Sequence, residues 1–134
     1  MSDKDYIMRM MEEFARVFAK VFFLRDTKQY AYAHMEVDNV SRMITGFTPN
    51  QLKALGPEGV RNVFDYKESN IEKIYYTARI VMEDAFLFEL EGKIDESLEN
   101  YAFALALFEH LKNRGFAGDN DMLNDISFIR KKIN

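Results

Sequence analysis

The chain has 134 residues, 48% of them hydrophobic and 30% charged, a composition typical of one globular domain and not of a disordered segment. Its 22 acidic residues against 18 Lys and Arg give a net charge of −4, so there is no electrostatic reason to expect nucleic-acid binding. The absence of cysteine excludes disulfides, thiolate metal sites and cysteine nucleophiles, and it suits a reducing cytoplasm.

The first predicted helix covers residues 4–24, where apolar side chains repeat every three or four positions. Because acids interrupt its apolar residues, we do not expect this N-terminal segment to be a signal peptide. No apolar run in the chain approaches the roughly 20 residues that a transmembrane helix needs. We therefore expect a cytoplasmic protein that makes no membrane contact.

A second helix is predicted over residues 27–45, and Gly46 provides its C-terminal signal. The link between the first two helices is short, which leaves an antiparallel arrangement as the only option. Residues 4–45 are therefore predicted to form a helical hairpin.

An irregular bridge of short helices is predicted over residues 47–68. Thr48, followed by a proline and then by Gln51, is a strong N-terminal capping signal. Gly56 and Pro57 end this short helix, and Pro57 opens another.

A second long hairpin is predicted over residues 69–113, with its turn at 91–93 and a capping box formed by Ser69 and Glu72. Apolar residues cover a wide arc of its second helix, which indicates that neighbours cover that helix on two sides. A final helix over 121–133, capped by Asp119 or Asn120, is predicted to cover it. The predicted fold is all-α, in a single domain spanning residues 1–134.

The second hairpin resembles a tetratricopeptide (TPR) repeat. The resemblance rests on the sequence Glu91-Gly92-Lys93-Ile94-Asp95-Glu96-Ser97-Leu98, followed by Tyr101 and Ala104-Leu105. TPR repeats place a glycine at the turn, then a small residue, an aromatic residue and an alanine at helical spacing. The resemblance implies TPR-like hairpins.

The whole chain resembles an uncharacterised family of small bacterial all-helical, TPR-like proteins. The segment that carries this resemblance runs from Asp5 to Phe14 (DYIMRMMEEF), and residues 100–105 (NYAFAL) and the closing amphipathic helix agree with it. The resemblance implies a fold and no established activity.

The TPR resemblance also implies a partner-binding site. Carried over residue by residue, the groove-facing positions are Arg79, Met82, Phe86 and Glu89. An apolar partner segment would lie against Met82 and Phe86, with Arg79 and Glu89 orienting it at the edge. The alternative is that Met82 and Phe86 pack against the N-terminal hairpin.

Neither histidine, His34 nor His110, has the Glu-x-x-His spacing of a helical metal site, and we interpret both as surface or boundary residues. His34 and Asp38 share a helical face that could support a weak metal contact. The acids at 83–84, 89–91 and 95–96 are expected to be solvated. Asp84 has mostly apolar neighbours, and we expect an exposed edge there in preference to a buried acid with a shifted pKa. We therefore predict no catalytic residue, no metal and no cofactor.

Eight Met, twelve Phe and seven Tyr are a high content for this length. Most should form core, yet some surplus apolar surface is expected, and such surfaces mark association sites. The leading hypothesis is a non-enzymatic protein–protein interaction module. One alternative is a small helical sensor or enzyme with a ligand pocket between the hairpins. Another is an obligate homodimer in which the first helix packs on its copy.

Overall fold

A computed structural model describes residues 3–64, 71–116 and 120–134, which form helices and contain no strand. The all-α fold is therefore confirmed. The helices are α1 (Asp3–Asp26), α2 (Tyr30–Thr45), α3 (Pro49–Phe64), α4 (Ile71–Leu90), α5 (Ile94–Asn113) and α6 (Asn120–Ile133). None of these helices is long and apolar enough to span a bilayer.

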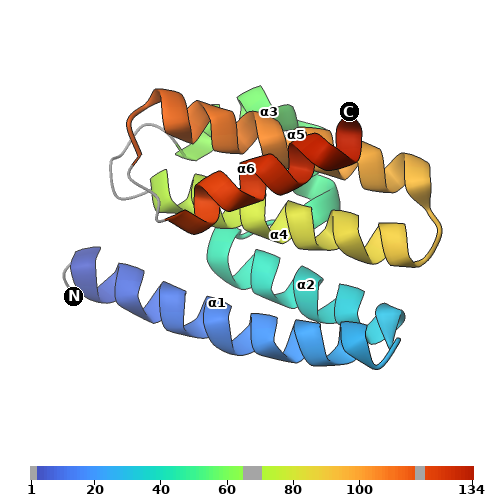
Figure 1. The fold of residues 1–134 in the computed structure, drawn as a ribbon. Coiled ribbons are helices and arrows are strands. Elements are labelled where there is room, and N and C mark those ends of the chain that lie inside the picture. The colour runs from blue at the N-terminus through green and yellow to red at the C-terminus, as the bar shows by residue number, and fades with distance from the viewer. Residues whose placement is uncertain (1–2, 65–70, 117–119) are drawn as a thin grey trace.

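Helix α4 is shared by two apolar cores. One face of α4, with Ile80 and Leu87, packs into a core formed with α1 and α2. The opposite face, with Val81 and Ala85, packs into a core formed with α3, α5 and α6. Figure 1 shows α4 between the α1–α2 hairpin on one side and α5 and α6 on the other. The two hairpins therefore associate through α4.

Helix α5 is covered by several neighbours, as its wide apolar arc predicts. It packs against α4, α3 and α6, and its Tyr101 and Phe108 side chains are almost completely buried. The closing helix α6 covers α5, which confirms that prediction. It also lies across α4 (Figure 1), a contact that no pattern in the sequence indicates.

The helix ends follow the glycine signals. Gly46 and Gly92 have φ of +84° and +80°, the left-handed conformation that glycine adopts without strain. The first turn differs from the prediction, because α1 runs on to Asp26 and α2 begins only at Tyr30. Lys28 takes a left-handed φ of +61° in that turn.

The bridge segment folds as predicted in its local details. The Thr48 backbone N–H donates to Gln51 Oε1 at 2.9 Å, and the Gln51 N–H donates to Thr48 Oγ1 at 3.2 Å. Gly56 breaks α3 into two short helical pieces. These pieces pack mainly on α4 and α5, so α3 is more a part of the second core than a bridge between the hairpins. Ser69 and Asp119, two predicted caps, lie outside the described residues.

Candidate functional site

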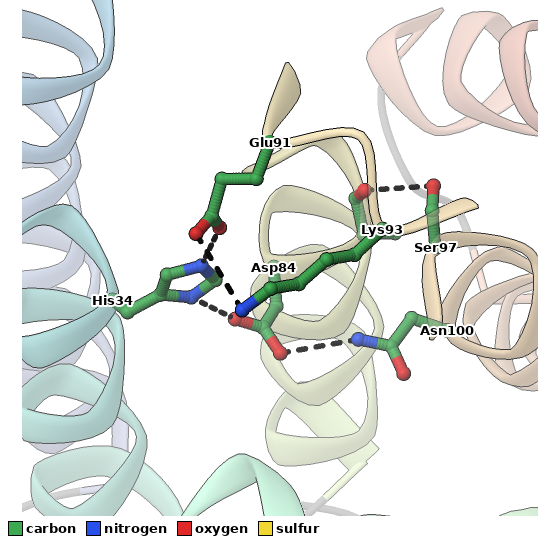
Figure 2. A network of polar contacts seen from close by, with 7 residues as sticks. His34, Asp84, Glu91, Lys93, Ser97 and Asn100 are labelled. Atoms are coloured by element: carbon green, nitrogen blue, oxygen red, sulfur yellow. Dashed lines mark hydrogen bonds and ion pairs between the residues drawn. The ribbon is translucent and has the colours of Figure 1, made fainter. Parts of the chain in front are cut away.

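A polar network joins the two hairpins where α2 passes the end of α4 (Figure 2). His34 on α2 extends toward α4, and its Nδ1 lies 2.8 Å from Asp84 Oδ1. Its Nε2 contacts the carboxylate of Glu91, at the turn between α4 and α5. From α5, Asn100 Nδ2 donates to Asp84 Oδ2 at 3.1 Å. One imidazole thus connects α2 to the α4–α5 hairpin.

The surroundings of His34 favour its charged form. Burial lowers the pKa of His34, but hydrogen bonds to Asp84 and Glu91 act the other way, and the pKa is raised overall. Burial, reinforced by the charge of Asp84, raises the pKa of the neighbouring Asp38. An imidazolium can donate from both ring nitrogens, and each nitrogen here faces a carboxylate oxygen. The ring is therefore positioned as a charged connector between two helical hairpins.

The expectation that Asp84 lies at an exposed edge is wrong. Its side chain is only 7% exposed, because this position of α4 faces α2 and α5. His34 is partly buried, as a boundary residue would be, but its role in the network was missed. No local signal could have revealed that role, because its partners lie 50 and 57 residues away in the sequence. Among the described residues, no group of three or more His, Asp or Glu side chains is placed to hold a metal ion.

A second buried ion pair connects α1 to α4. Arg25 Nη1 lies 2.9 Å from Glu83 Oε1, and the Glu83 side chain is 8% exposed. The Arg25 guanidinium also lies over the rings of Phe22 and Phe86, at 4.8 and 4.9 Å from their centroids. Burial raises the pKa of Glu83 to about 7, against the opposing effect of Arg25. The expectation that Glu83 is solvated is therefore also wrong.

The residues predicted to bind a partner lie on the side of α4 that faces α6. Arg79 Nη1 lies 2.5 Å from Asp125 Oδ2, and the ring of Phe86 stacks on that of Phe128 with centroids 6.1 Å apart. Glu89 accepts a hydrogen bond from Lys132 Nζ at 2.8 Å.

The fourth predicted residue, Met82, is half-buried against the core that α4 shares with α5 and α6. The alternative expectation, packing on the N-terminal hairpin, holds only for Phe86, through Arg25. Helix α6 of the same chain thus occupies the position predicted for a partner segment.

Exposed apolar side chains gather on the first hairpin. Most of the large apolar side chains that are exposed in the described residues belong to α1 and α2: Tyr6, Met8, Met11, Phe23, Tyr32, Met35 and Met43. An open pocket of about 280 Å³ lies between the start of α1 and the end of α2, lined in part by Tyr6, Met10 and Met43. Phe23 and Tyr32, at the other end of the hairpin, are 62% and 61% exposed. The apolar surplus predicted from composition is therefore concentrated on one hairpin.

Comparisons with protein-family models, with curated proteins and with solved structures found no match to this chain.

Proposed function

We propose that this chain is a non-enzymatic protein–protein interaction module whose binding surface is the solvent-facing side of the α1–α2 hairpin. The observation that carries the proposal is the exposure of large apolar side chains there, with Met8, Met11 and Met35 each about half exposed. Exposed apolar clusters mark association sites, and methionine adapts its shape to a partner. The proposed apolar binding surface is therefore on the first hairpin, whereas the TPR resemblance implies a surface on α4.

The polar clusters support a structural role over a catalytic one. A general base needs an atom within hydrogen-bond reach of its substrate. Both ring nitrogens of His34 contact carboxylates of the chain, and both Asp84 oxygens have internal partners. Glu83 is likewise engaged by Arg25. These groups hold helices together, which is what an interaction scaffold requires of them.

We also propose that the second hairpin is TPR-like. Its turn glycine, Gly92, is left-handed, and Ser97 Oγ donates to the Ala85 carbonyl at 2.9 Å where the two helices pack. The small side chains of Ala85 and Ser97 allow α4 and α5 to approach closely. Tyr101 and Ala104 of the same resemblance are buried in the core.

The test is affinity capture from lysate of the source cell with three baits. They are wild type, Met8→Glu/Met11→Glu, and Leu98→Glu/Leu123→Glu, which changes exposed apolar residues outside the first hairpin. Circular dichroism first establishes that all three are folded. We expect a protein retained by wild type and by the Leu98/Leu123 variant, and lost with the Met8/Met11 variant. Equal retention by all three baits would contradict the proposed surface.

A further inference from the structure

Helix α1 carries two apolar stripes. The first, formed by Met10, Phe14, Val17, Val21 and Leu24, is buried against α2 and α4. The second lies on another side of the helix and consists of Met8, Met11, Ala15, Ala19 and Phe22. Met8 and Met11 are 49% and 51% exposed, Ala15 and Ala19 are exposed, and Phe22 is half-buried. A helix that is apolar on two sides is usually covered on both. In the described part of the chain the second stripe is covered only at Phe22, which packs against the first core and under the Arg25 guanidinium.

The second stripe has a symmetrical spacing. Its members follow one another at intervals of three, four, four and three residues, so the pattern reads the same from either end. Ala15 is at its centre, and the larger side chains of Met8 and Phe22 are at its two ends. When two such helices lie antiparallel and cross at Ala15, Met8 of each copy lies opposite Phe22 of the other. The small alanines in the middle allow the two helices to approach closely.

The charges of α1 have the matching asymmetry. Residues 5–13 contain three acids and one base, whereas residues 14–26 contain three bases and one acid. These bases also have partners in their own chain: Arg16 pairs with Glu13, Lys20 with Glu36 and Arg25 with Glu83. In an antiparallel pair, the acidic first half of each helix lies along the basic second half of the other. Two charged residues lie next to the stripe. Glu12 is one turn from Met8 and from Ala15, and Arg16 is one turn from Ala19. A parallel pair would place like charges together.

We propose that the second stripe of α1 binds a second copy of this chain, as an antiparallel, two-fold symmetric helix pair that crosses at Ala15. This inference rests on the proposed function and specifies that the bound partner is a second copy of the chain. The pairing is isologous, so each contact occurs twice and the assembly closes as a dimer. Each half of the interface buries four residues that the fold of one chain leaves exposed: Met8, Met11, Ala15 and Ala19.

Single cysteines test the orientation cleanly, because the natural chain has none. Cysteines form a disulfide only when their Cβ atoms come within about 3.5–4.5 Å. Under mild oxidation we expect Ala15→Cys to give a covalent dimer, and Ala102→Cys, at an exposed position of α5, to give none. Met8→Cys alone should stay unlinked but should cross-link to Phe22→Cys when the two variants are mixed. Rapid linking of Met8→Cys to itself would overturn the antiparallel arrangement.

A charge exchange tests the same arrangement without cysteine. Glu12→Lys and Arg16→Glu should each raise the dimer dissociation constant, by roughly tenfold over the two symmetric contacts. The double variant Glu12→Lys/Arg16→Glu should recover most of the affinity, because each copy then presents the exchanged charges to the other. Light scattering with size-exclusion chromatography gives the mass of each variant over a range of concentrations. If the dimer of the double variant is weaker than that of either single variant, the predicted charge contacts are contradicted.

The mass of the wild type separates this inference from the proposed function. A wild-type chain with twice the monomer mass, converted to monomer by Ala15→Glu, would support the α1 pairing. A wild-type chain that remains monomeric at high micromolar concentration would overturn it. The capture experiment with the Met8/Met11 variant would then still decide whether the same hairpin binds a different protein.

Discussion

Adjacent buried carboxylates on α4, Glu83 and Asp84, connect that helix to three others. Glu83 pairs with Arg25 of α1, whereas Asp84 contacts His34 of α2 and accepts a hydrogen bond from Asn100 of α5. Breaking a buried pair by removing one partner leaves the other charge uncompensated, and this costs more than an exposed ion pair contributes. The two acids should therefore determine how the hairpins sit on each other.

Replacing His34 by Ala should lower the free energy of unfolding by about 1–3 kcal/mol, because it leaves the buried Asp84 oxygen without its partner. The pKa of His34 is raised in the folded state, so its contribution is complete below the unfolded pKa of roughly 6.5. The contribution is lost as pH rises through the folded pKa. Urea unfolding at acidic and alkaline pH should show a larger effect at acidic pH. An effect that is larger at alkaline pH would contradict the charged-connector interpretation.

Glu83 should make the fold sensitive to pH in a second window. Its folded pKa of about 7 is above the ordinary value of 4.5, so the folded state holds the proton more tightly than the unfolded state. Stability from this group is present at acidic pH and is lost as pH rises from 4.5 to 7. Glu83→Gln keeps a neutral side chain, so its stability relative to wild type should increase across that window. Glu99→Gln, at an exposed position of α5, is the control and should show no such trend.

At the scale of elements, α4 determines the architecture because both of its faces are apolar. Its partners differ in kind: α5 follows it through a tight glycine turn, whereas α2 and α6 reach it from distant parts of the chain. Tyr101 and Phe108 of α5 fill the core on one side of α4 and are at most 1% exposed. The α4–α5 hairpin should therefore tolerate loss of these rings poorly.

Tyr101→Ala or Phe108→Ala should each lower the free energy of unfolding by roughly 3–5 kcal/mol, through lost apolar contacts and the cavity that remains. Chemical denaturation followed by circular dichroism measures the change. Ala102→Gly on the exposed side of the same helix should cost only about 1 kcal/mol through helix propensity. If either substitution lowers the free energy of unfolding by well under 1 kcal/mol, that ring is not packed in the core of the hairpin as described.

At the scale of the whole molecule, local patterns and long-range contacts differ in how far the sequence reveals them. Helix periods and the turns at Gly46 and Gly92 are local properties, and those predictions are confirmed. The burial of Asp84 depends on a histidine 50 residues away, and no local pattern indicates it.

The predicted partner-binding site on α4 likewise depends on a long-range contact that local patterns do not reveal. The TPR resemblance implies that Arg79 and Phe86 face a groove, but the resemblance does not show that α6 returns to cover that face. The second stripe of α1 is different, because its period of three and four is visible in the sequence. Only the structure shows which of the two stripes is buried.

The proposed interaction surface is the solvent-facing side of the first hairpin, and specifically the second stripe of α1. The most direct measurement is nuclear magnetic resonance of the ¹⁵N-labelled chain titrated with unlabelled copies of itself. We expect concentration-dependent chemical-shift changes for Met8, Met11, Ala15 and Ala19, and none around Asp84. Shifts confined to the α4–α6 contact at Phe86, or spectra unchanged at high concentration, would contradict it.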